Sequence, residues 1–217
     1  MDNYDNNYWT LRLDDCEKAL TKNNFLVRRA ETAEEAGRIV LDELLPATEA
    51  KTVSWGGSMT LKSLGIYDAL SNDSQYETLN PYQPGLSREE MMEIRRRALL
   101  VDCYLLSTNA LTQTGKLVNL DMTGNRVGAL TFGPRHVIVV AGRNKLVADI
   151  EDALFRVKDR AAPPNAMRLD MKTPCVKTGF CEDCASPQRI CNTWTITEKS
   201  FPKQRVKVVL VNQDLGI

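Results

Sequence analysis

The sequence predicts an α/β domain in which helices cover both faces of a mainly parallel sheet. Two observations predict this class. Runs with the apolar spacing of helices alternate with short β-like runs, and one β-like run, 136–142, is almost wholly apolar. Both features are typical of parallel sheets buried between helices. With 217 residues, the chain is long enough for one well-filled core, so we expect a single domain over 1–217.

The chain begins with the order helix, strand, helix. The apolar spacing over residues 9–23 predicts a helix, and a short β-like run follows at 25–29. Thr32 is expected to begin a second helix, because Glu35 stands three residues later and completes a capping box. This helix is expected to end at Pro46.

The same alternation continues towards the middle of the chain. A short strand at 51–55 ends in two glycines and leads into a helix at 58–70. A weak strand at 76–79 precedes a helix capped by Ser87, which has a glutamate three residues later, and the strand 101–107 follows.

Residues 108–135 differ in character, because short strand-like runs are joined there by turn residues. We expect a loop-rich or hairpin insertion, where binding sites tend to lie. The run 136–142 predicts a buried central strand, and 145–160 predicts an amphipathic helix that ends before the Pro163–Pro164 pair. These assignments predict a core over about 9–162.

The remaining segment divides into a cysteine loop at 172–192 and C-terminal strands at 193–217. Within the latter, 193–198 is a weaker strand and 205–211 a strong one, because it is rich in valine.

Composition excludes two classes of partner. Lys plus Arg and Asp plus Glu each total 28, so the net charge is zero and the field that holds a polyanion such as nucleic acid is absent. No run approaches the roughly 18 apolar residues of a membrane span, and no secretory signal is recognisable at the start. We therefore expect a cytoplasmic protein.

Four cysteines form the most specific motif. Cys175, Cys181, Cys184 and Cys191 have the spacing C-x5-C-x2-C-x6-C within a polar loop. Four thiolates complete either a tetrahedral zinc site or a 4Fe-4S cluster, so the number of ligands does not choose between them. The alternative is two disulfides or plain buried thiols, which the cytoplasm and the polar loop respectively disfavour. Cys16 and Cys103 lie on apolar segments, where we expect core residues.

A glycine-rich turn joins the strand at 51–55 to the following helix. Gly56, Gly57, Ser58 and Thr60 place free backbone N–H groups and two hydroxyls where a phosphate or carboxylate would fit. The alternative is an ordinary tight turn in which Ser58 caps the helix.

A second polar run separates two apolar strands. Asn109, Thr112 and Asn125 suit a polar ligand, Arg126 suits a bidentate contact to a carboxylate or phosphate, and Asp121 is the one candidate for a catalytic base. The alternative is that these side chains stabilise turns.

Three polar residues, Arg143, Asn144 and Lys145, follow the buried strand 136–142 directly. They are expected at the carboxyl end of the sheet, where open α/β sheets bind ligands, unless they form a solvated basic cap. His136 precedes this strand and is expected to be structural, and no serine–histidine catalytic pair is supported.

Four segments together resemble the LUD (lactate utilisation) family: SWGGSMTLKSLGI, STNALTQTGKLVNLDMTGNRVGALTFGP, HVIVVAGRNK and PCVKTGFCEDCASPQRICN. The match spans roughly 25–217. The resemblance implies a three-layer fold similar to the sugar-phosphate isomerases and CoA transferases, whose strand-end loops bind phosphate-bearing or acyl ligands. A likeness of fold does not assign a reaction.

The resemblance also implies a role as an accessory or subunit of organic-acid oxidation, specifically of L-lactate, beside iron-sulfur and FAD-linked subunits. The chain departs from the larger iron-sulfur member of the family because it lacks paired C-x2-C-x2-C-x3-C runs. Two other functions stay open. One is a ligand-binding metabolic or regulatory protein with a structural zinc, and the other is an isomerase or acyl-transferase that uses Asp121, so the sequence alone does not decide whether the protein is an enzyme.

Overall fold

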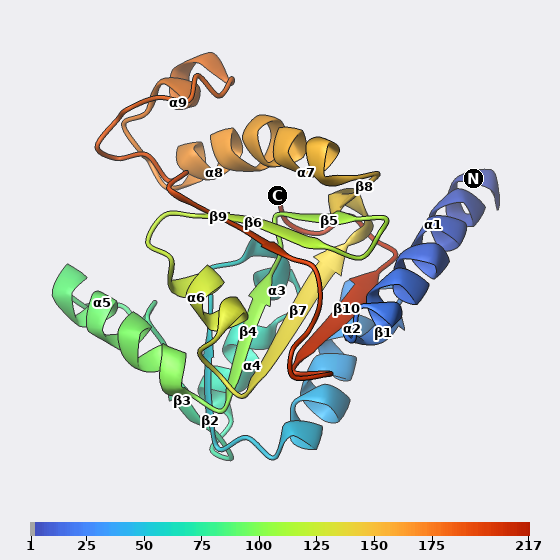
Figure 1. Ribbon diagram of the computed structural model, residues 1–217. Coiled ribbons are helices and arrows are strands. Elements are labelled where there is room, and N and C mark those ends of the chain that lie inside the picture. The colour runs from blue at the N-terminus through green and yellow to red at the C-terminus, as the bar shows by residue number, and fades with distance from the viewer. Residues whose placement is uncertain (1–2) are drawn as a thin grey trace.

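A six-stranded parallel sheet lies at the centre of the computed structural model, which describes residues 3–217 (Figure 1). Every strand pair in the sheet is parallel, and neighbours in space come from distant parts of the chain. Its strands, in spatial order, are β1 (Leu26–Ala30), β10 (Val206–Val211), β7 (His136–Gly142), β4 (Cys103–Ser107), β2 (Thr52–Trp55) and β3 (Glu77–Leu79).

Helices cover both faces of this sheet, so the predicted three-layer α/β class is confirmed. Alternate residues of one strand enter opposite cores: Tyr104 and Leu106 of β4 face one apolar cluster, and Cys103 and Leu105 face the other. The first face is covered by α1 (Asn3–Lys22), the short helix Ala98–Leu100 and α6 (Asn125–Thr131). The second is covered by α2 (Ala33–Arg38) with its π-helical continuation Ile39–Leu44, α3 (Met59–Ser63) and α4 (Ile66–Asn72).

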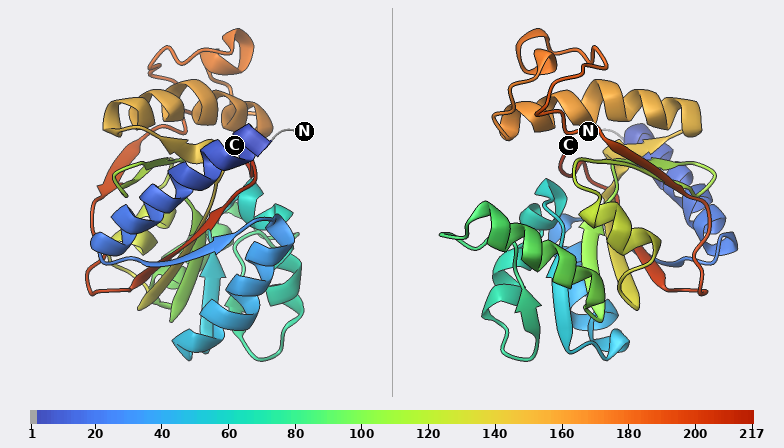
Figure 2. Two further views of the ribbon diagram at one scale, coloured as in Figure 1. Left: turned by 90° about the vertical axis from the view of Figure 1, so that its right-hand side faces the viewer. Right: turned by 60° about the vertical axis from the view of Figure 1, so that its left-hand side comes forward.

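A smaller sheet lies across the carboxyl ends of the large one. Figure 2 shows it between the large sheet and a layer of helices. Its strands are β8 (Leu146–Val147), β5 (Ala110–Thr112), β6 (Leu117–Asp121) and β9 (Thr193–Thr197), in that order. The helices above it are α7 (Ile150–Arg156), the π-helical segment Val157–Ala161 and α8 (Ala162–Arg168). This arrangement places the loops that follow β2, β4, β6 and β7 beneath α8.

Two further helices stand outside these layers. The helix α5 (Arg88–Arg97) has the predicted capping box, because Ser87 accepts from the backbone N–H of Glu90 and the Glu90 carboxylate accepts from that of Ser87. The short helix α9 (Pro174–Thr178) lies within the cysteine loop. No helix in the part of the chain that the structure describes is long and apolar enough to cross a membrane.

The structure corrects five of the sequence predictions. The helix expected over 145–160 begins only at Ile150, because Asp149 caps it there. Leu146 and Val147 instead pair with β5 as strand β8.

The expected helix at 58–70 is divided by Gly65, which has a positive φ of 69°. The last of the strand-like runs expected within 108–135 is instead helical, because α6 covers Asn125–Thr131 and its Val127 and Leu130 are spaced to bury one helical face. A short apolar run fits either structure, so periodicity did not discriminate.

The other two corrections concern the end of the core. The helix expected to stop before Pro163 is followed directly by α8, which accommodates both prolines in its first turn, where no N–H is needed. The core does not end near 162, because β10 lies between β1 and β7 and all six of its residues are buried.

Candidate functional site

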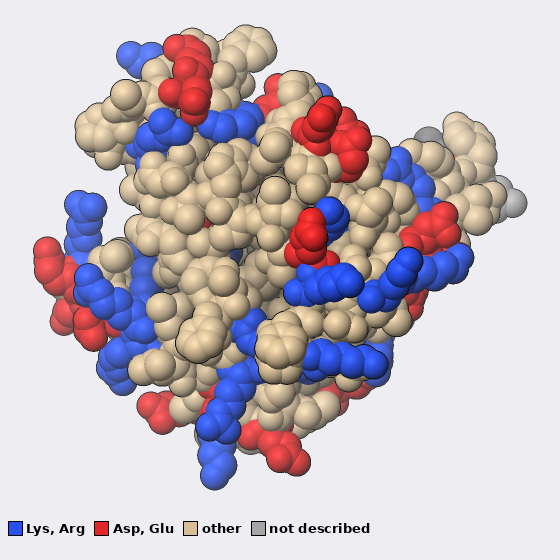
Figure 3. Space-filling model, viewed as in Figure 1, with Lys and Arg blue, Asp and Glu red and all other residues tan. Residues whose placement is uncertain are grey.

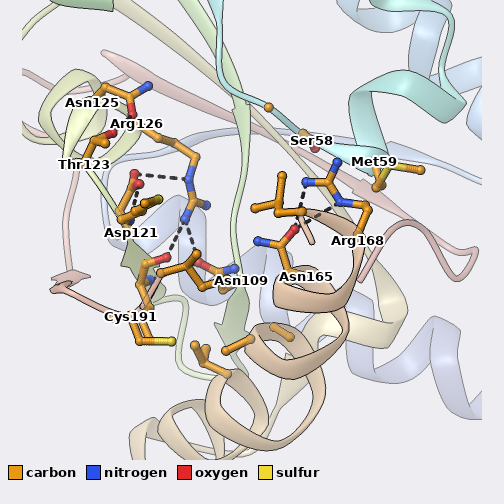
Figure 4. A pocket seen from close by; sticks show the side chains of 18 of the residues that line it. Ser58, Met59, Asn109, Asp121, Thr123, Asn125, Arg126, Asn165, Arg168 and Cys191 are labelled. Carbon is orange, nitrogen blue, oxygen red and sulfur yellow. Dashed lines mark hydrogen bonds and ion pairs between the residues drawn. The ribbon is translucent and has the colours of Figure 1, made fainter. Parts of the chain in front are cut away.

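A cavity of about 350 Å³ opens at the carboxyl ends of the strands, beneath α8. Figure 4 shows Arg126 between Asp121 and Asn109 on one wall, and Arg168 beside Asn165 on the other, close to Ser58 and Met59. The cavity is therefore built by the loop after β2, the loop after β4, the β6–α6 connection and α8. Two of the three polar loops singled out in the sequence converge here.

Positive charge dominates the lining of this cavity. Four cationic side chains, Lys62, Arg95, Arg126 and Arg168, line it together with one carboxylate, that of Asp121. On the face viewed in Figure 3, by contrast, basic and acidic side chains are interspersed. The cavity lining therefore carries an excess of positive charge in a chain whose net charge is zero, which favours an anionic ligand.

Arg126 is held by the protein through most of its donor groups. Its Nη1 donates to the Ser107 carbonyl and to Asn119 Oδ1, each at 3.0 Å. Its Nη2 donates to Asn109 Oδ1 at 2.8 Å and to the Leu120 carbonyl at 2.9 Å. Arg126 therefore organises the loops around it, and its fork is not free for the bidentate ligand contact that the sequence suggested.

The carboxylate of Asp121, the candidate base, is also held by contacts within the protein. One of its oxygens accepts from the backbone N–H of Met122 at 2.7 Å. The other lies 3.5 Å from Nε of Arg126 and accepts from the Val127 N–H at 3.3 Å. Both oxygens of this carboxylate are thus occupied by the backbone and by Arg126, which suits a loop-ordering role better than proton abstraction.

The glycine-rich turn is partly committed to structure as well. The Ser58 hydroxyl accepts from the Leu61 N–H, as expected of a helix cap, and the Ser58 N–H donates to the Tyr67 hydroxyl at 2.7 Å. The Gly56 N–H donates to the carbonyl of Leu105. Gly57 and Ser58 line the cavity, and a side chain at Gly57 would come within 2.8 Å of the Tyr82 hydroxyl.

Lys145 is the most unusual charged residue near the site. Its side chain is buried, and its Nζ donates to Ser107 Oγ at 2.9 Å, Thr60 Oγ1 at 3.0 Å and the Thr108 carbonyl at 3.2 Å. Burial, reinforced by the positive charges of Arg156 and Arg126, lowers the pKa of Lys145 to about 7. Lys145 and Thr60 line a second, smaller cavity that adjoins the first.

The remaining residues predicted for ligand binding lie elsewhere. Arg143 pairs with Asp214 and lies over the ring of Trp9, and Asn144 accepts from the Leu215 N–H. Thr112 stabilises the β5–β6 turn, since its hydroxyl accepts from the Lys116 N–H. None of these three lines either cavity, whereas Asn109 lines both and Asn125 lines the larger one.

Several lining residues had no signal in the sequence. Arg95 lies in a run of three arginines on α5, where spacing does not indicate which one points inward. Asn165 and Arg168 were missed because the preceding helix was expected to end at the prolines. Lys62 and Tyr82 come from a helix and a loop with no distinguishing pattern.

The four C-terminal cysteines converge on a separate small cavity of about 20 Å³, lined also by Lys158 and Arg189. All of them are free thiols, and burial raises the pKa of Cys191. As placed, no three Cys, His, Asp or Glu side chains within residues 3–217 are close enough to hold a metal ion. Cys191 and Ile190 line both this thiol cavity and the larger cationic one.

Comparisons with known proteins bear on the family and the fold. A family model described as LUD domain matches residues 13–211. No curated protein matches the sequence significantly. A DUF162 family protein from Deinococcus radiodurans is similar in structure over 94% of this chain and 98% of that chain, with 16% sequence identity and a TM-score of 0.52. The structure of eIF2B delta from Chaetomium thermophilum covers 51% of this chain and 48% of its own, with 17% identity and a TM-score of 0.29. At these identities, the first likeness bears on the fold alone.

Proposed function

This chain belongs to the LUD domain family, and we propose that it binds a small organic anion, such as L-lactate, beside a thiolate-held metal centre. In this proposal it serves as an accessory or subunit of organic-acid oxidation in the cytoplasm, where thiols stay reduced. One observation carries the proposal: the cationic cavity at the strand ends shares Cys191 with a cavity lined by four thiols.

The anion is assigned from the guanidinium groups that still have donors to offer. The buried Nε of Arg95 has no hydrogen-bond partner among residues 3–217, and its guanidinium lies over the ring of Tyr82. Arg168 uses Nε and Nη2 to hold Asn165 Oδ1. Arg95 and Arg168, rather than Arg126, are therefore the side chains that we expect to contact a carboxylate.

The donor set around the thiol cavity fits a soft metal. Four cysteines supply the ligands, and Lys158 and Arg189 would offset the thiolate charge. Both cations also bind Asp183, which ties the cysteine loop to the helical layer. A bound iron-sulfur cluster would be held by these four cysteines and would supply a one-electron acceptor at a cavity that shares Cys191 with the anion cavity.

The size of the thiol cavity favours a second candidate, a structural zinc. A cavity of about 20 Å³ holds roughly one water molecule, which matches a single ion better than a cluster of eight atoms. With zinc, the centre would fix the cysteine loop against α8 and shape the wall of the anion cavity, and the protein would bind its ligand without taking part in electron transfer.

Metal analysis of protein purified without oxygen tests the proposal. About four iron and four sulfide per chain support the redox form, and about one zinc supports the structural form. Cys181→Ser and Cys184→Ser should abolish metal retention, whereas Cys103→Ser, which changes a buried strand residue far from the loop, should retain it. Equal metal content in all three variants would contradict the assignment of the thiol site.

Ligand binding is tested separately by titrating L-lactate and following the visible spectrum of the iron-loaded protein or the melting temperature of the zinc-loaded protein. A change that saturates, and that Arg168→Gln weakens, supports the cationic cavity as the binding site. Binding that is unaffected by Arg168→Gln would place the ligand elsewhere.

A further inference from the structure

A smaller cavity of about 70 Å³ continues from the cationic cavity towards the centre of the sheet. The two share Ser58, Asn109, Arg126 and Arg168 as lining residues. The small cavity has room for about two water molecules, and so for a single carboxylate or phosphate group. Its polar floor consists of Thr60 in α3, Ser107 at the end of β4 and Lys145 in the 3-10 turn after β7.

Lys145 faces this cavity with neutral oxygen partners only. Its side chain is 4% exposed, and its three hydrogen bonds go to two hydroxyls and a carbonyl. The charged groups nearest to it are also cationic: Arg156 on α7, Arg126 on α6 and, across the cavity, Arg168 on α8. Asp121 is turned away towards Arg126, and no ion pair joins Lys145 to any carboxylate within residues 3–217, the α-carboxylate of the lining residue Ile217 included.

A buried ammonium group without a counterion is unstable, so the neutral amine is favoured when the cavity holds no anion. The low pKa of Lys145, about 7, follows from the same surroundings. An anion in the small cavity would supply the missing counterion and reverse the preference.

We propose that the small cavity is a subsite for one carboxylate or phosphate group, and that Lys145 takes up a proton from solvent when the anion binds. This inference rests on the proposed anion-binding function. The step balances because an N–H bond forms on the amine as the proton leaves a solvent acid, hydronium or protonated buffer, and the anion keeps its charge.

The two hydroxyls explain how a buried amine acts on the ligand. A neutral amine has a lone pair, which accepts a hydrogen bond from one neighbouring hydroxyl. Once protonated, Lys145 donates all three of its hydrogens, and the one hydroxyl hydrogen that its lone pair had accepted is released. In the structure the Thr60 hydroxyl donates to the Leu215 carbonyl at 3.3 Å, and the Ser107 hydroxyl donates to the Thr108 carbonyl at 3.4 Å. Both are long bonds that an anion in the cavity would replace. The charge of the amine and the redirected hydroxyl then act on the ligand together.

Isothermal titration calorimetry on the full, metal-loaded chain tests this coupling. The probes are L-lactate for a carboxylate and sulfate for a tetrahedral anion, because neither changes its protonation in the range used. Each is titrated in two buffers that differ in ionisation enthalpy, at about pH 6 and about pH 8.5. We expect about one proton to be taken up per anion at the higher pH and almost none at the lower, with affinity falling about tenfold per pH unit above about pH 7.

Lys145→Met and Lys207→Met form a matched pair of variants. Lys207 is also a buried lysine whose pKa is lowered by burial, but it lies at the opposite end of the sheet, beside His136. Lys145→Met should bind the probe at least about tenfold more weakly near neutral pH, with no proton uptake. Lys207→Met should match the wild type in both, and circular dichroism verifies that each variant is folded.

The outcomes separate the subsite from the larger proposal. If neither probe binds to the wild type, the anion-binding function itself fails. If a probe binds with no proton uptake at either pH, or with the same uptake in Lys145→Met, the anion cavity stands and the role of Lys145 is wrong. Proton uptake with L-lactate only identifies a carboxylate subsite, and uptake with sulfate only identifies a phosphate subsite.

Discussion

Lys145 and Arg126 show how two cations of one site differ when their partners differ. Arg126 has four oxygen acceptors and a neighbouring carboxylate, so its charge is compensated by the protein. The three hydrogen-bond partners of Lys145 are neutral, so the charge of its ammonium group must be compensated by solvent or by a bound anion. The sequence placed both residues among the ligand-binding candidates, but only contact geometry separates the residue that organises the site from the one that is left uncompensated.

Replacing Lys145 should change how stability depends on pH. The pKa of Lys145 is about 7 in the folded protein against an ordinary value of 10.5, so the unfolded chain binds the proton more tightly. Between these two pKa values, a rise in pH therefore stabilises the folded state. Lys145→Met has no buried amine to protonate, so its stability should not depend on pH in this way. The difference in free energy of unfolding between Lys145→Met and the wild type should therefore favour the variant most below about pH 7 and should shrink as pH rises.

Urea denaturation at several pH values from about 6 to 9.5 measures this difference. Lys207→Met serves again for comparison, because any trend that it shares reflects the loss of a buried lysine in general. Parallel curves for Lys145→Met and the wild type would show that the amine keeps its ordinary pKa in the fold.

Arg126→Met should destabilise the protein by about 2–4 kcal/mol, because the Ser107 and Leu120 carbonyls and two amide oxygens would lose their donor. Arg168→Gln is the matched control. Arg168 is exposed and, within residues 3–217, its side chain hydrogen-bonds only to Asn165, so its replacement should change the free energy of unfolding by less than about 0.5 kcal/mol while weakening anion binding. Equal destabilisation by the two substitutions would contradict the division of roles between the two arginines.

Secondary-structure elements were predictable where the sequence carries a local chemical signal. The box formed by Ser87 and Glu90 began α5 as expected, and the run 136–142 became the buried strand β7. The prediction failed where a local signal was absent or misleading. Over seven residues, the apolar spacing of α6 also fits a strand. Pro163 is typical of a helix end but equally fits the first turn of a new helix, which is where it lies.

The turn between β5 and β6 offers a test of how closely two elements pack. Gly115 has a φ of 76°, and a side chain there would come within 2.7 Å of the Leu20 backbone nitrogen in α1. Gly115→Ala should therefore destabilise the protein by about 2 kcal/mol or more, because both the turn and the helix would have to move.

Gly85→Ala is the control for this substitution, because Gly85 also has a positive φ, of 88°, but has no atom within 4 Å of the added side chain. It should cost about 1 kcal/mol from backbone conformation alone. Denaturant unfolding compares the two variants, and equal losses would show that contact with α1 does not limit the turn.

At the scale of the whole molecule, the class of fold followed from the alternation of helices and strands, but the order of strands did not. Pairing between β1 and β10 joins residues that are about 180 positions apart, and no local pattern encodes such a partner. The site shows the same division. The run 143–145 was expected at the carboxyl end of the sheet, but the sequence did not show which polar loops would meet there, and Arg95 and Arg168 reach the cavity only through tertiary packing.

The position of β10 has a consequence for how the protein is made. The chain emerges from the ribosome N-terminus first, so β1 and β7 are synthesised before β10, the strand that lies between them in the sheet. Until residues 206–211 emerge, the apolar residues of β7 have an unpaired edge, and β1 has no neighbour in the sheet. The open edge of β7 is therefore available to other chains while residues 143–205 are synthesised, and the sheet is complete only when β10 enters between β1 and β7.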